Sequence, residues 1–354
     1  MKIPADKPIA LALSGGGIRA MVFHLGTLQY LAERSLLERV THVSSVSGGS
    51  LIVGLIIAQN HMRWPTSREY LDVVLPALRT KLCRRSLQWG ALRQLVRPRN
   101  WRYLLSRANL LASALKHEWQ IQSSLADLPE TPEWSINGTN AENGRRFRFK
   151  KQNFGDYLIG YAPSGRFPLA DAMAVSAAFP GGFGPLALEA HAHVWHKRRN
   201  WNDPAGSEVV VDAPFKRLHL YDGGVYDNLG LEPYFDAGKG VAKLPEHFVI
   251  ASDAGLPLSE GLAKGAVNPG RLKRVADIMS DQARALRVRT FVHFVTQQAG
   301  RGAFAFIGCT GEAVDLKRAE VAKVYPTTLR RMSELDFDEI ARHGLEAAGA
   351  CLGA

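Results

Sequence analysis

The stretch IALALSGGGIR at residues 9–19, followed by VSSVSGGS at residues 43–50, carries the strongest structural pattern in this chain. The apolar start of the first stretch predicts a buried strand that leads directly into three glycines. Apolar residues then recur at helical spacing over residues 18–34, and residues 40–46 predict a second, β-branched strand that ends at Ser47. The unit is therefore strand, glycine loop, helix, strand and serine.

This connection has room for one helix, so we expect the two strands to be parallel neighbours with a right-handed crossover. Both loops then lie at the same carboxyl edge of the sheet, where open α/β folds bind their ligands. A serine on a tight strand-to-helix turn presents its hydroxyl outward, and Gly48 and Gly49 leave room for the bend. The pattern predicts a serine hydrolase in which Ser47 attacks and the loop Gly15, Gly16 and Gly17 supplies N–H donors to the oxyanion.

A candidate general base lies far downstream, in the run LHLYDGGVYDN at residues 218–228. The alternation of apolar residues predicts a strand, and Asp222 followed by Gly223 and Gly224 would lie at its exposed end. An Asp before glycines is also common in simple turns. Asp227 and Asp253 remain competing candidates for the base.

Together these three segments resemble the patatin-like phospholipase family. That family combines a glycine-rich oxyanion loop followed by a basic residue, a G-x-S-x-G elbow, and an Asp-Gly-Gly or Asp-Gly-Ala motif. The small-residue run ending in proline at residues 174–180 also looks like the family's. Two positions depart from the pattern: Ser45 replaces the first glycine of the elbow, and Ser14 replaces the Asp that often precedes the glycines.

The resemblance implies a lipid acyl hydrolase of the phospholipase A or lysophospholipase type, with a Ser47-Asp222 dyad and no metal or organic cofactor. It implies a three-layer α/β/α fold with a mostly parallel central sheet. Arg19, the basic residue after the glycine loop, would support the oxyanion hole electrostatically or only structurally. The same family includes enzymes that wait for an activating factor, so an activating protein partner stays open.

Each motif also has a simpler interpretation. The glycine loop could be a phosphate-binding or plain tight turn, and Ser47 alone could be a helix N-cap. A Ser-Asp-His triad is the mechanistic rival, for which His293 or His343 has the right chain order. We expect His24 to be a packed histidine. Functional alternatives are an esterase or thioesterase on another acyl substrate, and a catalytically weak membrane-binding protein of the same fold.

The length of 354 residues and 46% hydrophobic content allow a sizeable core. Because the motifs must converge, we expect one catalytic domain over residues 1–354, with a basic helical insertion or lid at 61–130 and a loop or hairpin insertion at 187–215. Further strands are predicted at 134–138, 145–150, 218–221 and 247–252. Further helices are predicted near 170–178 and 270–288 and over about 333–350.

Charge is the second informative feature. The net charge of +11 and the pI near 9.7 predict an acidic partner. Residues 73–117 contain ten Lys or Arg and no Asp or Glu, interleaved with apolar and aromatic residues such as Trp89 and Trp101. Such a stretch can dock on an anionic membrane, or it can be a solvated helical insertion whose apolar residues pack on the sheet. No recognition motif supports nucleic-acid binding.

Three widely spaced cysteines indicate reduced thiols, and no metal-ligand spacing occurs. The apolar run at residues 9–13 is too short for a signal peptide, and the longest apolar run, residues 51–58, is too short to cross a bilayer. We therefore expect a cytoplasmic protein, peripheral on membranes, whose partner is a lipid or anionic membrane surface.

Overall fold

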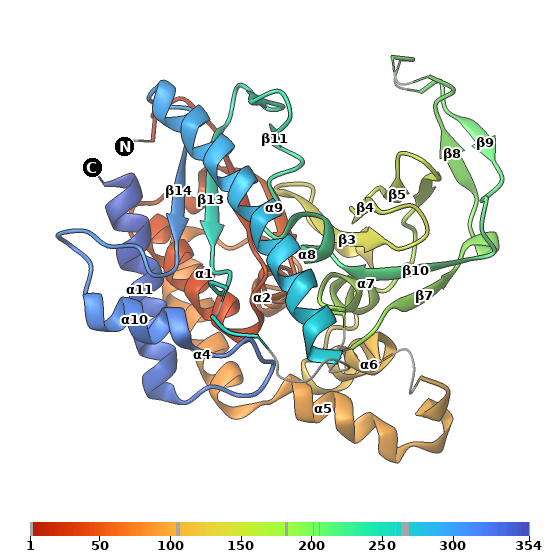
Figure 1. The fold of residues 1–354 in the computed structure, drawn as a ribbon, viewed down its shortest axis with the longest axis horizontal. Helices are drawn as coiled ribbons and strands as arrows, with labels where there is room; N and C mark the ends of the chain where they lie inside the picture. The colour runs from red at the N-terminus through yellow and green to blue at the C-terminus, as the bar shows by residue number, and fades with distance from the viewer. Residues whose placement is uncertain are drawn as a thin grey trace.

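A computed structural model of the chain describes residues 3–103, 107–180, 183–200, 202–204, 206–258, 260–262 and 269–353. It has helices on both faces of one large sheet (Figure 1). Alternate residues of β1 (Ile9–Leu13) enter two different cores. Ile9, Leu11 and Leu13 pack under the helices of one face, while Ala10 and Ala12 pack on the opposite face with Phe291. The expected three-layer α/β/α arrangement is therefore confirmed.

Five neighbouring strands of the sheet run parallel, in the order β14-β13-β1-β2-β3. The carboxyl ends of β1, β2 and β13 are in register, since Leu13 pairs with both Ser45 and Ser252. The loops that follow these strands consequently meet at one edge, as the sequence predicted. Their bounds are β1 Ile9–Leu13, β2 Val40–Val46, β3 Glu133–Asn140, β13 Phe248–Asp253 and β14 Gly302–Phe306.

Beyond β3 the sheet continues through antiparallel pairs, an extension that the sequence analysis did not predict. Its outermost pair, β8 and β9, projects from the body as a hairpin within the segment expected to be a loop or hairpin (Figure 1). The strands are β4 Arg145–Phe149, β5 Asn153–Asp156, β6 Gly160–Pro163, β7 Leu186–Glu189, β8 Trp195–Lys197, β9 Val209–Val211 and β10 Arg217–Asp222, with a separate ribbon of β11 Phe235–Asp236 and β12 Val241–Ala242.

One strand of this extension determines the site. On the edge of β3 that pairs with β2, the parallel pairing stops at Asn137, opposite Val46. β10 takes over from there in antiparallel orientation and ends with Asp222 opposite Gly138. β4 occupies the other edge of β3 at these residues. The carboxyl ends of β2 and β10 therefore meet head to head, which brings Ser47 and Asp222 together.

The helices form the two outer layers and the insertion. α1 and α11 pack closely because Gly26 faces the Ala341 carbonyl and Gly344 faces the Phe23 carbonyl, so neither position has room for a Cβ. The main helices are α1 Gly17–Ala32, α2 Gly48–Gln59, α7 Leu169–Ser176, α8 Gly224–Asp227, α9 Pro269–Gln297, α10 Leu316–Val324 and α11 Glu334–Leu352. The segment expected to be a basic helical insertion holds α3 Ser67–Glu69, the π-helical η2 Tyr70–Val74, α4 Leu75–Arg84, α5 Leu87–Arg93, the short η3 Gln94–Val96 and η4 Pro98–Tyr103, and α6 Ala108–Glu118.

The predicted elements all form, with ends that move by a few residues. The helix predicted near 270–288 is longer and reaches Gln297. Throughout the part of the chain that the structure describes, no helix combines the length and the apolar character needed to cross a bilayer.

Candidate active site

The turn between β2 and α2 has the strained geometry expected of a nucleophile elbow. Ser47 has φ 51° and ψ −118°, in a region that side-chain-bearing residues rarely adopt. Its backbone N–H donates to the Ser176 carbonyl (3.1 Å) and to Ser176 Oγ (3.0 Å), which holds the turn from the end of α7. The sequence analysis noted this small-residue helix but did not assign Ser176 a role.

Gly48 and Gly49 have no space for a side chain. A Cβ on Gly48 would lie 2.3 Å from the Gly17 carbonyl oxygen, and one on Gly49 would lie 2.5 Å from the Leu13 carbonyl oxygen. The elbow is therefore packed directly against the end of β1 and the glycine loop. Close backbone approach therefore requires glycine at both positions, a reason that adds to the room for the bend expected from the sequence.

Ser45 fits where the family pattern has glycine because its hydroxyl has partners below the elbow. Ser45 Oγ accepts from Trp134 Nε1 (2.8 Å) and bonds Ser50 Oγ (2.8 Å). Ser50 Oγ bonds Ser176 Oγ in turn (2.8 Å). A buried hydroxyl with such partners costs little, so this departure leaves the elbow intact.

The glycine loop leaves several N–H groups without a protein acceptor. Gly15 N–H donates to the Asn228 carbonyl (3.1 Å), whereas the N–H groups of Gly16, Gly17 and Gly48 have no acceptor among the residues that the structure describes. Gly17 N and the Cβ position of Gly48 are 3.1 Å apart, so these donors are neighbours. They suit an oxyanion that forms beside Ser47.

Arg19 supports this loop from inside the protein. The guanidinium is fully buried and donates to the Ala254 carbonyl through Nε (3.2 Å) and Nη2 (2.9 Å), and to the Tyr325 carbonyl through Nη1 (2.5 Å). Burial lowers the pKa of Arg19 to about 10. Of the two roles considered from the sequence, this geometry favours the structural one.

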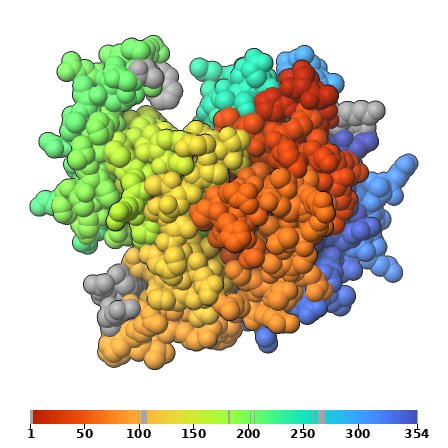
Figure 2. All heavy atoms as spheres, turned by 180° about the vertical axis from the view of Figure 1, so that it is seen from behind, coloured from red at the N-terminus to blue at the C-terminus, as the bar shows by residue number. Residues whose placement is uncertain are grey.

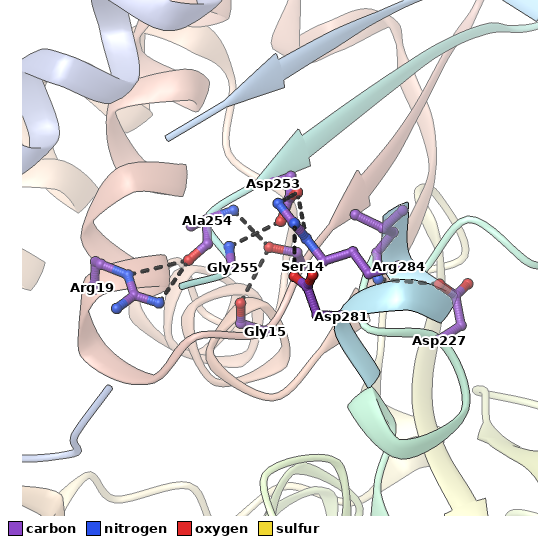
Figure 3. A network of polar contacts seen from close by, with 10 residues as sticks. Ser14, Gly15, Arg19, Asp227, Asp253, Ala254, Gly255, Asp281 and Arg284 are labelled. Atoms are coloured by element: carbon purple, nitrogen blue, oxygen red, sulfur yellow. Dashed lines mark hydrogen bonds and ion pairs between the residues drawn. The ribbon is translucent and has the colours of Figure 1, made fainter. Parts of the chain in front are cut away.

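Ser14 and Asp253 tie the glycine loop to the end of β13 (Figure 3). Ser14 Oγ accepts from Ala254 N–H (2.8 Å). This bond connects the start of the glycine loop to the segment after β13, at the position where the family often has Asp. Asp253 accepts from Gly255 N–H (2.9 Å) and from Arg284 Nε of α9 (2.9 Å). The loop therefore rests on an ion pair between a buried carboxylate and a partly exposed arginine, which the sequence did not indicate.

Asp222 is buried, with 3% of its surface exposed, at the carboxyl end of β10. Its backbone is fixed by Asp222 N–H to the Ala178 carbonyl (3.1 Å) and by Thr139 Oγ1 to the Asp222 carbonyl (2.8 Å). Gly224 N–H donates to the carboxylate (2.7 Å). Burial raises the pKa of Asp222 from 3.8 to about 7, although hydrogen bonds from Gly224 N–H and the Ser47 side chain oppose that rise. The carboxyl is thus desolvated and faces the elbow serine.

The competing acids have other partners. Asp253 is paired with Arg284, and Asp227 accepts from the N–H groups of Leu229 (3.1 Å) and Glu232 (2.9 Å). These contacts explain both carboxylates as structural groups.

The three histidines considered from the sequence form hydrogen bonds to groups other than Ser47 and Asp222. His24 is buried between Ser252 Oγ (2.8 Å) and the Ser14 carbonyl (2.9 Å), so its prediction as a packed histidine is confirmed. His343 accepts from Gly308 N–H (2.9 Å), and His293 bonds Gln297 in the last turns of α9. The structure therefore gives the triad alternative no support.

Asn228 is a residue that sequence reasoning missed. A Cβ on Gly15 would lie 2.4 Å from Asn228 Oδ1, and one on Gly224 would lie 2.7 Å from the same atom. The amide thus fills the space between the glycine loop and the Asp motif. Its place at the end of the DGGVYDN run was the available signal. As for metals, the described residues contain no group of three or more His, Cys, Asp or Glu arranged to hold an ion.

Comparison with known proteins identifies a family and a similar fold. The family model for patatin-like phospholipase matches residues 11–234. Human GIVD cytosolic phospholipase A2 has a similar fold (TM-score 0.59, 14% identity), with 97% of this chain and 58% of that chain covered. The same human protein in complex with methyl gamma-linolenyl fluorophosphonate and terbium chloride gives a TM-score of 0.52 at 14% identity, covering 98% of this chain and 58% of that one.

This chain therefore spans little more than half the length of these solved structures. No curated protein sequence matches it significantly. The family model nevertheless covers well over half of the chain and includes the glycine loop, the elbow and the Asp motif. The chain belongs to the patatin-like phospholipase family.

Proposed function

We propose that the protein is a lipid acyl hydrolase of the phospholipase A or lysophospholipase type, with Ser47 as nucleophile and Asp222 as general base. One observation carries this proposal: the ends of β2 and β10 meet, so that a strained serine faces a buried carboxyl whose pKa is about 7. A carboxyl with an ordinary pKa would be a poor base for an alcohol, whereas this desolvated one is matched to neutral pH.

In the proposed reaction, the Asp222 carboxylate takes the Ser47 proton while Ser47 Oγ attacks the ester carbonyl carbon. The carbonyl oxygen becomes an oxyanion that accepts from the N–H groups of Gly16, Gly17 and Gly48. Collapse of this intermediate breaks the bond to the alcohol, which leaves with the proton from Asp222. Water then attacks the acyl-enzyme, Asp222 again accepts a proton, and the fatty acid is released while Ser47 regains its hydrogen.

We place this reaction at the cytoplasmic surface of a membrane, with an anionic lipid surface as the partner. The net charge of +11 supports attraction to such a surface. The name of the human structural neighbour, a cytosolic phospholipase A2, supports the substrate class.

A fluorophosphonate tests the proposal because it reacts covalently with an activated serine. The human neighbour was solved with methyl gamma-linolenyl fluorophosphonate, and we would use that compound as the probe. We expect stoichiometric labelling of the wild type and none of Ser47→Ala. Ser207→Ala, at an exposed serine, serves as the matched control and should label fully. Hydrolysis of mixed phospholipid vesicles should follow the labelling pattern.

Absence of labelling in the folded wild type would contradict the proposed nucleophile. Labelling of Ser47→Ala would assign the reactive serine to another position. Labelling without release of fatty acid from phospholipid, but with cleavage of a small ester or thioester, would reassign the substrate class.

A further inference from the structure

The helix α5 and the turn η3 that continues it carry two apolar faces. One face, with Leu87, Gly90 and Ala91, is buried against α6. The other is exposed, and its members follow each other at three and four residues, which places them on one stripe of the helix. We define the apolar stripe as these residues and the neighbouring Trp101 of η4, with their exposed fractions: Trp89 54%, Leu92 44%, Val96 81% and Trp101 60%.

The rim of the apolar stripe is basic. Arg93 and Arg97 are exposed on the same turns, and the Arg330 guanidinium lies 5.9 Å from the Trp89 ring centre. Among the residues that the structure describes, the acidic partner of this rim is Glu118, which pairs with Arg93 (3.4 Å). Because residues 73–117 contain no Asp or Glu, the rim keeps a positive charge.

The exposed apolar stripe together with its basic rim indicates which kind of partner binds this surface. An anionic bilayer offers negative headgroups to the basic rim and hydrocarbon to the apolar side chains directly below. A second copy of the chain would have to bring the same basic rim against this one, because a two-fold interface uses identical patches. Charge complementarity therefore favours the bilayer over self-association.

The apolar stripe lies beside the glycine loop. Gln88 N–H donates to the Leu329 carbonyl (3.0 Å), and the side chains of Gln88 and Thr328 bond each other (2.9 Å). The Thr328 carbonyl accepts from Ile18 N–H (2.8 Å), directly after the glycine loop. Thr328 also leaves no room for a Cβ on Gly17. One short segment thus connects the docking face to the oxyanion donors.

Two exposed apolar side chains also lie close to Asp222 along the chain. Phe179 and Val225 are exposed, and each directly follows a residue that hydrogen-bonds Asp222. Figure 1 shows α5 beyond the carboxyl end of β13, at the end of the molecule where the strand loops gather. A membrane that contacts the apolar stripe would therefore face the active-site edge.

We propose that the apolar stripe inserts into the headgroup region of an anionic phospholipid bilayer and holds the active-site edge against it. The proposal that the apolar stripe docks on a membrane depends only on the properties of this surface. The further role in delivering lipid to Ser47 rests on the proposed function.

Binding to vesicles in the Ser47→Ala background tests the docking without hydrolysis. We would measure flotation with phosphatidylcholine vesicles that contain or lack phosphatidylserine. The triple variant Trp89→Ser, Leu92→Ser, Val96→Ser should bind the phosphatidylserine vesicles at least about tenfold more weakly. The double variant Arg93→Gln, Arg97→Gln should weaken binding to phosphatidylserine vesicles only. Thermal melting checks that each variant folds.

The matched control replaces three other exposed apolar residues, Val194, Val210 and Val241, with serine. Val210 lies in β9 and Val194 directly precedes β8, and Figure 2 shows this hairpin (green) at the top of the molecule, whereas the residues around 100 (orange) lie at the bottom. This control should bind vesicles like the parent. Quenching of Trp89 by brominated lipid, taken as the difference from Trp89→Phe, should confirm insertion of that side chain.

Parent-like binding by the triple variant, equal loss in the valine control, or no vesicle binding by the parent would overturn the docking proposal. Light scattering adds another such outcome: an oligomer that dissociates in the triple variant would make the apolar stripe a self-association surface. The proposed function fails separately, through absence of fluorophosphonate labelling. Vesicle binding without fluorophosphonate labelling would support the docking proposal and contradict the hydrolase proposal. Labelling without vesicle binding would support the hydrolase proposal and contradict the docking proposal.

Discussion

The elbow at Ser47 and the apolar stripe on α5 differ in how closely the protein surrounds them. Around the elbow, a Cβ on Gly48 or Gly49 would come within 2.5 Å of backbone oxygen. On the apolar stripe, Val96 is 81% exposed. The fold therefore determines each residue of the elbow, whereas the stripe is left for a surface outside the protein. Substitutions at the elbow should affect the chemistry, and those on the stripe should affect only where the protein binds.

The largest effect is expected from Asp222→Asn, which removes the base but keeps the shape. The rate should fall about 10² to 10⁴-fold. The free energy of unfolding should rise in this variant. The pKa of about 7 means that ionising the buried Asp222 carboxyl opposes folding, and asparagine does not ionise. Below about pH 4 Asp222 is neutral in both the folded and the unfolded protein, so the wild type has its full free energy of unfolding. As the pH rises through about 7, ionisation of the buried carboxyl lowers that free energy.

Thermal unfolding across pH checks this second part. The Asn variant should exceed the wild type by on the order of a few kcal/mol above pH 7, with the difference vanishing near pH 4. A variant that is both inactive and less stable at pH 8 would show that Asp222 is a structural group.

Gly48→Ala should separate the elbow from the glycine loop. The new methyl group would lie 2.3 Å from the Gly17 carbonyl oxygen, so one of the two backbones must move. Displacing an oxyanion donor typically costs about 10² to 10³-fold in rate, and steady-state kinetics would measure it. Gly238→Ala is the matched control, because its nearest neighbour would be at an ordinary 3.4 Å. Equal losses of rate in Gly48→Ala and Gly238→Ala would show that the close packing of the elbow on the glycine loop does not matter for activity.

Arg284→Met should destabilise the support of the glycine loop. It leaves the fully buried Asp253 carboxylate without its cation, a change that typically costs about 3 to 5 kcal/mol. Urea unfolding would measure it. The control is Arg68→Ala, which breaks an exposed pair with Asp72 and should cost less than about 1 kcal/mol. Similar losses in the two variants would mean that the buried pair does not hold the site.

The pH dependence of the wild type is the next smaller effect. Because Asp222 must be ionised to accept the Ser47 proton, kcat/KM on a water-soluble ester should rise with pH to a plateau with a midpoint near 7. Below the midpoint it should fall about tenfold per pH unit. A midpoint near 4 would mean that the base titrates as an exposed carboxyl and that the buried site is not responsible.

The smallest effect is expected from Trp89→Ser on stability. The side chain is 54% exposed and contacts the rest of the protein on one flank, so the free energy of unfolding should change by less than about 0.5 kcal/mol. Urea unfolding in the absence of lipid would detect a larger loss. Such a loss would indicate that the insertion packs through Trp89, and the contrast with the elbow would weaken.

Local pattern was enough for the parts of this fold that are close in sequence. An apolar strand, three glycines, an apolar helix and a β-branched strand can combine in few ways, because parallel strands need a right-handed crossover. The sequence therefore predicted the elbow, the glycine loop and the parallel strand pair, while the three-layer order came from the family resemblance. Asp222 was identified from its motif and its family resemblance, with Asp227 and Asp253 still open.

Other features required the tertiary structure because they depend on contacts between distant segments. The role of Ser176, which holds Ser47 from 129 residues away, leaves no periodic signal in the sequence. The same applies to the Asp253–Arg284 pair and to Asn228 between two glycine motifs. Basic composition alone likewise could not separate the buried face of α5 from the exposed one.

The sequence by itself determined which residues carry the candidate chemistry, because a strained elbow and a close backbone approach need glycine and serine at fixed local spacing. The tertiary structure decided that Ser47 and Asp222 meet. That outcome depends on β10 running antiparallel on the edge of β3 that β2 vacates after Val46. Strand direction and register across such a separation are set by packing of the whole sheet, which no local pattern encodes.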